Sequence, residues 1–204
     1  MLLTIYFCAI FLSNEILYAT MKMIKFWMTC FGIVLCPLLT IAQTDSLQFP
    51  AAWAGNWTGT LQIYNGKGMV QSLAMTVEIA QLDTSTQGRY TFGLIYGSKD
   101  QDWRPYELVP VNPAKGIWKV DEKNTIAMES YYYGNKLMCW FVVQGSRVLC
   151  TYEKTSDKEM VFEVMSGAEK AASTTGNSTH QGEAIPEVLT YPIATFQRAI
   201  LHRE

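Results

Sequence analysis

The stretch Gly55-Asn56-Trp57-Thr58-Gly59-Thr60-Leu61-Gln62-Ile63-Tyr64 decides the fold. Its residues alternate: Trp57, Leu61 and Ile63 fall on one face of an extended chain, and the polar residues between them fall on the other. A period of two residues is typical of a β-strand with one buried side. Asn65-Gly66 follows at once and predicts a tight hairpin turn.

The same pattern continues through most of the chain. Turn signals arrive about every ten residues, and this spacing predicts an all-β sandwich or barrel. We expect further strands at 69–81, 89–96, 103–111, 117–120, 125–133, 137–143, 148–154, 159–165 and 193–203. Pro105 and Pro110 restrict the fourth strand to an edge or a bend. Residues 167–186 are rich in Ala, Ser, Thr and Gly, and they predict a flexible loop or a mobile lid.

Residues 1–42 predict a secretory signal peptide with an extension in front of it. Met21 to Lys25 supplies a basic start, Phe26 to Leu39 is an uncharged apolar run, and we place the cut after Ala42. Basic residues belong at the front of a signal, so translation is expected to begin at Met21 or Met23. The alternative is a membrane anchor, for which 26–41 is short. We therefore predict a secreted or periplasmic protein with one domain at 43–204 and no membrane span in its mature part.

Composition excludes some functions. The 204 residues carry a net charge of −2, which offers no basic face for nucleic acid. No cysteine–histidine cluster has the spacing of a metal site, and no nucleophile elbow, phosphate loop or dinucleotide motif occurs. We accordingly predict neither a catalytic residue, a metal nor a cofactor, and we predict that the protein is not an enzyme.

Cys139 and Cys150 are the cysteines of the predicted mature chain, and they lie in consecutive strands. If Gln144-Gly145 is the loop, the two cysteines are directly opposed and within reach of a disulfide. If Gly145-Ser146 is the loop, they are offset. Glycine at the first loop position favours the second register, whereas secretion favours the disulfide.

The opening motif Gly55-Asn56-Trp57, placed after a signal peptide and before a meander of hairpins, resembles the lipocalins and the wider calycin group. That resemblance implies an up-and-down antiparallel β-barrel of about 8–10 strands, closed at one end by Trp57. It also implies a basic side chain across the tryptophan, here Arg198 or Arg203. Arg198 shares a face with Phe196 and is preferred. The stretch 116–124 is also similar to small secreted bacterial proteins of unassigned function.

The prediction for function is a barrel that binds a small apolar ligand. Nine side chains are expected to line its interior: Leu61, Met75, Val77, Tyr90, Phe92, Met128, Tyr132, Phe141 and Phe162. These side chains could also simply fill the barrel. One alternative is a non-catalytic structural or protein-interaction module of the cell envelope, acting through exposed Tyr131, Tyr133, Trp140 or Val161. A second is an outer-membrane barrel, because alternation alone does not say which face points inward.

Overall fold

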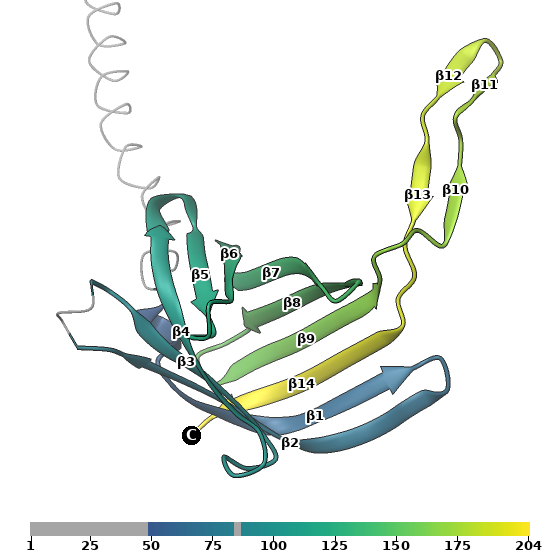
Figure 1. Ribbon diagram of the computed structural model, residues 1–204. Helices are drawn as coiled ribbons and strands as arrows, with labels where there is room; N and C mark the ends of the chain where they lie inside the picture. The colour runs from purple at the N-terminus through teal and green to yellow at the C-terminus, as the bar shows by residue number, and fades with distance from the viewer. Residues whose placement is uncertain (1–48, 84–86) are drawn as a thin grey trace, which may run out of the picture. The chain divides into compact units, whose positions relative to one another are not determined.

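The chain forms a closed barrel of ten antiparallel strands (Figure 1). The structure is a computed structural model that describes residues 49–83 and 87–204. The predicted signal peptide and its extension lie outside the described residues. The barrel strands are β1 Gly55–Asn65, β2 Gly68–Gln81, β3 Tyr90–Tyr96, β4 Trp103–Asn112, β5 Ile117–Asp121, β6 Ala127–Tyr133, β7 Lys136–Val143, β8 Ser146–Lys154, β9 Glu159–Ala168 and β14 Thr195–Arg203.

Each strand pairs with its neighbours in sequence, and β14 pairs with both β9 and β1, which closes the sheet. The prediction of an all-β, up-and-down barrel is therefore confirmed. A closed barrel has no edge, so β4 keeps its two prolines inside the sheet. Pro105 lies opposite Gly93, and the register of β4 against β5 shifts between Pro110 and Asn112. Of the two positions predicted for this proline-containing strand, an edge or a bend, the structure shows the bend.

Gly59 lets β1 and β14 approach each other. A Cβ atom at this position would overlap the main-chain carbonyl of Ile200, closer than real Cβ atoms come to any atom. Because β1 and β14 are the strands that close the barrel, the glycine in the opening motif contributes directly to closure.

Two hairpin ladders replace the loop expected at 167–186. β10 Ser173–Thr175 pairs with β13 Val188–Thr190, and β11 Ser178–His180 pairs with β12 Glu183–Ile185. Together they form a ribbon between β9 and β14, drawn yellow-green in Figure 1. Their side chains are exposed. Hydrophobic alternation is absent from this segment because neither face of the ribbon is buried.

Two short 3-10 turns complete the described elements, Ala51–Trp53 before β1 and Pro113–Lys115 between β4 and β5. No helix within 49–83 and 87–204 is long and apolar enough to cross a membrane.

Candidate functional site

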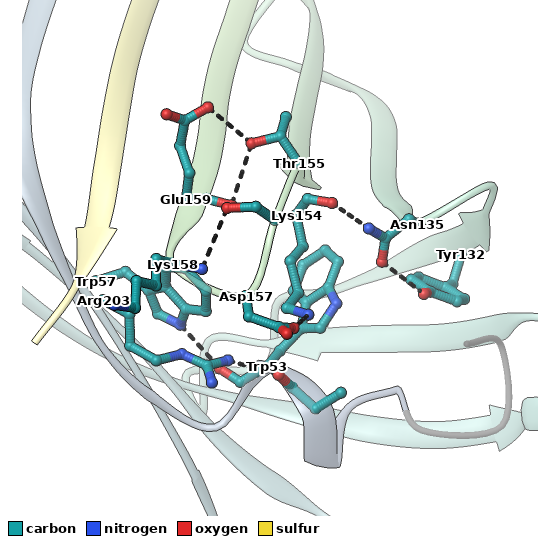
Figure 2. Close-up of polar contacts among 12 residues, drawn as sticks. Trp53, Trp57, Tyr132, Asn135, Lys154, Thr155, Asp157, Lys158, Glu159 and Arg203 are labelled. Carbon is teal, nitrogen blue, oxygen red and sulfur yellow. Dashed lines mark hydrogen bonds and ion pairs between the residues drawn. The ribbon is translucent and has the colours of Figure 1, made fainter. Parts of the chain in front are cut away.

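One end of the barrel, called here the closed end, is sealed by Trp57. The indole is fully buried and donates from Nε1 to the carbonyl of Trp53, at 2.8 Å (Figure 2). The guanidinium of Arg203 lies 4.4 Å from the centre of the Trp57 ring, and its Nη2 donates to the carbonyl of Ala52, at 2.5 Å. This geometry combines a cation–π contact with a charged hydrogen bond.

Arg203, and not the preferred Arg198, is therefore the residue that covers the tryptophan. Register explains the difference: Arg203 lies opposite Trp57, so that it shares the inward face with buried Ala199 and Leu201. Arg198 points outward and pairs with Glu163 at 3.6 Å. Phe196 and Ile200, which suggested an apolar inward face, are on the outer surface of β14 with it.

Aromatic side chains thicken the seal at the closed end. Phe49 stacks on Tyr132 with ring centres 4.0 Å apart, and it packs edge-on against Trp53 and Trp118. The Tyr132 hydroxyl donates to Asn135 Oδ1 at 3.1 Å, as Figure 2 shows. Tyr132 thus belongs to the seal, and its hydroxyl is bound to Asn135 at this end.

A basic and an acidic side chain lie on the same seal. Lys154 points inward from β8 and is buried, and its ammonium contacts Asp157 Oδ1 at 2.5 Å. The ammonium of Lys154 holds the pKa of the Asp157 carboxyl below its ordinary value. Asn135 also donates to the main-chain carbonyl of Lys154. The bond from Asn135 joins the turn after β6 to the end of β8.

The other end of the barrel, called here the mouth, opens into a cavity of about 390 Å³. This volume lies in the range of small-molecule sites. Its inner part is apolar and is formed by side chains from β1, β3, β8 and β9, including Leu61, Leu94, Tyr152 and Phe162. The seal at the closed end forms no part of this lining.

Four of the nine predicted lining residues reach the cavity: Leu61, Met128, Phe141 and Phe162. The other five point inward as predicted but lie in the packed core, namely Met75, Val77, Tyr90, Phe92 and Tyr132. Alternation identifies the inward face correctly, because it depends only on the period of a strand. It carries no information on whether an inward side chain meets another side chain or an open space.

Polar groups gather on the mouth side of the cavity. Arg104 donates two hydrogen bonds to Asp102, at 3.0 and 2.9 Å, and its guanidinium lies 4.7 Å from the centre of the Tyr96 ring. The hydrogen bonds from Arg104 lower the pKa of the Asp102 carboxyl. Burial raises the pKa of Tyr96, and burial and then Glu122 raise that of Tyr106. Both phenols therefore stay protonated at neutral pH.

These polar residues were missed by the sequence analysis. Asp102 directly precedes β4, and Arg104 and Tyr106 lie on it at spacings of two residues. The three side chains therefore share one face, and this face is the inward one. The sequence signal that could have identified them is a set of polar residues two positions apart, which is the spacing of residues on one face of a strand. Pro105, which lies between Arg104 and Tyr106, hid that pattern, because proline marks a strand as irregular.

Cys139 and Cys150 are directly opposed across β7 and β8, and both line the cavity. The two-residue loop is Gln144-Gly145, so the register favoured from the sequence is wrong. Gln144 and Gly145 both have positive φ, of 49° and 74°, which is the geometry of a type I′ turn. Both thiols are free. Burial raises the pKa of Cys150 to about 12, so this thiol is neutral.

No protein-family model matches the sequence, and no curated protein matches it. Solved structures with a similar fold include the following two. One is a protein of unknown function from the DUF3598 family of Nostoc punctiforme, with 11% identity over 76% of this chain and a TM-score of 0.52. The match spans 48% of that protein, so this chain corresponds to about half of its length.

The other is the S-type phycobiliprotein lyase from Guillardia theta, with 9% identity over 79% of this chain and 94% of the lyase, and a TM-score of 0.50. It corrects one prediction. We expected from the sequence that the protein is not an enzyme, but a barrel of this fold carries the name of a lyase, so that exclusion is wrong. At these identities the comparisons establish the barrel fold alone.

Proposed function

We propose that this protein binds a small ligand with an apolar body and one polar end inside the barrel. The cavity of about 390 Å³, sealed by Trp57 at one end and open at the other, carries this proposal. Burial of apolar ligand surface against Leu61, Leu94 and Phe162 supplies the affinity, at about 25 cal/mol per Å² removed from water.

The polar end of the ligand lies beside Arg104. A guanidinium has five N–H donors, and two of them bind Asp102. The contact with Asp102 fixes the orientation of the guanidinium, so that little side-chain entropy is lost when a ligand arrives. Asp102 also offsets its charge, which favours a neutral hydrogen-bond acceptor on the ligand over a bare anion. Fixed orientation and partial neutralisation are both properties of a specificity group.

The named function of the lyase supports a ligand or chromophore as the occupant of such a barrel. The predicted location adds a second part to the proposal: the barrel acts in a secreted or periplasmic setting. Sequencing the N-terminus of the protein isolated from its source tests this part. A start at residue 43 in material from outside the cytoplasm supports it, and an N-terminus at residue 1 in cytoplasmic material refutes it.

Native mass spectrometry of the protein purified from its own source tests binding. The expected result is a retained mass in the intact protein. The variant Val164→Phe places a larger side chain in the cavity and should lose the bound mass. Its matched control is Val161→Phe, on the outward face of the same strand. Equal retention by both variants would refute the cavity as the site.

A further inference from the structure

Exposed hydrophobic side chains surround the mouth. Every connection at this end carries at least one: Met69 after the β1–β2 turn, Trp103 after the β3–β4 turn, Ile126 before β6, Val142 and Val143 before the β7–β8 turn, and Ile193 before β14. Their exposed fractions run from 44% for Val143 to 69% for Ile193. We call these six residues the mouth rim.

The closed end differs. Its described turns at 134–135 and 155–158 are polar, and among the described residues near this end only Val111 and Tyr133 are large, apolar and exposed. Scattered apolar side chains are normal on a protein surface, whereas a grouped set marks an interaction site. The grouping of the mouth rim at one end of the barrel is the observation that needs an explanation.

Cations accompany the exposed indoles near the mouth. Lys99 Nζ lies 5.2 Å from the ring centre of Trp103, and the guanidinium of Arg147 lies 6.0 Å from that of Trp140, which is 68% exposed on β7. Indole rings and long basic side chains share the polar–apolar boundary of a bilayer, because each has an apolar body and a polar tip.

The charges at this end nearly cancel. At the connections of this end and the strand residues next to them, five basic side chains stand against six acidic ones, namely Lys67, Lys99, Lys123, Arg147 and Lys170 against Asp100, Asp121, Glu122, Glu169, Glu183 and Glu187. Arg104 is paired with Asp102. Lys99 and Lys123 are also paired with glutamates of the barrel wall. Binding of such a surface to a bilayer does not require anionic lipid, because its affinity comes from the burial of apolar side chains.

We propose that the mouth rim docks on a lipid surface, with the mouth facing the bilayer. A protein partner needs a continuous patch of matching shape, whereas the mouth rim consists of separate side chains on five connections around an opening. Fluid lipid conforms to such a ring. The docking places the entrance of the cavity at the bilayer, but it does not depend on whether the cavity holds a ligand.

Tryptophan quenching tests the docking. Trp53, Trp57 and Trp118 are buried, whereas Trp103 and Trp140 are exposed, so the last two respond to a change of surroundings. Protein isolated with its natural N-terminus is mixed with phosphatidylcholine vesicles whose acyl chains carry bromine. The expected result is a blue shift and strong quenching, of which a large part is lost in Trp103→Phe. Quenching of Trp103 also separates docking from tethering through the N-terminal segment.

A matched pair of variants locates the contact. Trp103→Ser combined with Val142→Ser and Val143→Ser should weaken partition into neutral vesicles by about tenfold or more. Val111→Ser combined with Tyr133→Ser, at the closed end, should leave it unchanged. Absent quenching of Trp103, or equal loss in both variants, would overturn the proposal. Sedimentation without lipid that shows a dimer shielding Trp103 would overturn it in favour of a second copy of the chain.

Discussion

Replacing Arg203 by alanine should lower the free energy of unfolding, whereas replacing Arg198 should not. Arg203→Ala deletes a cation–π contact worth about 0.5–2 kcal/mol. It also deletes a charged hydrogen bond to Ala52, worth about 1.5–3 kcal/mol. Against these losses, Nε of Arg203 is buried with no hydrogen-bond partner in the described residues, a penalty of about 1–3 kcal/mol that the variant relieves. The net expectation is a loss of about 2 kcal/mol.

Urea unfolding followed by tryptophan fluorescence measures the loss, and Arg198→Ala is the matched control. Arg198 lies on the same strand, and its ion pair with Glu163 is on the outer surface of the barrel and partly exposed. Its removal should therefore change the free energy of unfolding by less than about 0.5 kcal/mol. A double-mutant cycle with Trp57→Phe isolates the ring contact, with an expected coupling of about 1 kcal/mol. If Arg203→Ala and Arg198→Ala were equally stable, the assignment of Arg203 to the seal would be refuted.

Three further predictions concern the barrel wall and the cavity. Gly59→Ala should lower the free energy of unfolding by about 2–3 kcal/mol in urea, because the new methyl group forces β1 away from a main-chain carbonyl of β14; an unchanged midpoint would contradict this close approach. Cys150 should react with iodoacetamide at pH 8 about a hundredfold more slowly in the folded than in the unfolded protein, because its pKa near 12 keeps the thiol protonated. Mass spectrometry can follow this reaction. A fast reaction, or a disulfide to Cys139 in freshly isolated protein, would contradict a buried, free and neutral thiol. Asp102 has a lowered pKa, so its pair with Arg104 stabilises the fold above about pH 4, and this stabilisation is lost as the pH falls through the lowered value. The difference in free energy of unfolding between wild type and Asp102→Asn, at most about 1 kcal/mol, should therefore disappear in acid. A difference that stays constant with pH would contradict the stabilising role of the pair.

The strand pattern was predictable from local sequence. β1 was expected at 55–64 and runs from Gly55 to Asn65, and its hairpin turn lies at Asn65-Gly66 as expected. Each half-buried strand needs only its own alternation to be recognised, and each tight turn needs only its own glycine or asparagine. The burial of Trp57 followed from the same local pattern.

The inward face of β14 and the register of the β7–β8 hairpin could not be predicted from local sequence. In β14 both faces carry apolar side chains, so alternation left two choices, and only the pairing with β1 places Arg203 inward. At the β7–β8 turn, Gln144 adopts a positive φ that is uncommon for residues other than glycine. Side chains across two strands set that register, and they outweigh the preference of the turn for glycine at its first position.

Three strands, β5, β8 and β9, nevertheless show a sequence signal for the cavity, because the side chains on their inward faces become smaller toward the mouth. On β8 the inward residues grow from Val148 and Cys150 near the mouth to Tyr152 deeper in the barrel. On β9, Phe162 lies deeper in the barrel than the smaller Val164. On β5, the inward residue nearer the closed end is Trp118, whose ring is part of the seal. Large side chains meet across the axis and fill the barrel, whereas valine and cysteine do not reach, because a ten-strand barrel is wider than the eight-strand barrels that side chains can fill. On β5, β8 and β9 the end at which the inward residues become small is therefore the end that opens into the cavity, whereas β4 and β7 carry Tyr106 and Phe141 into its lining there.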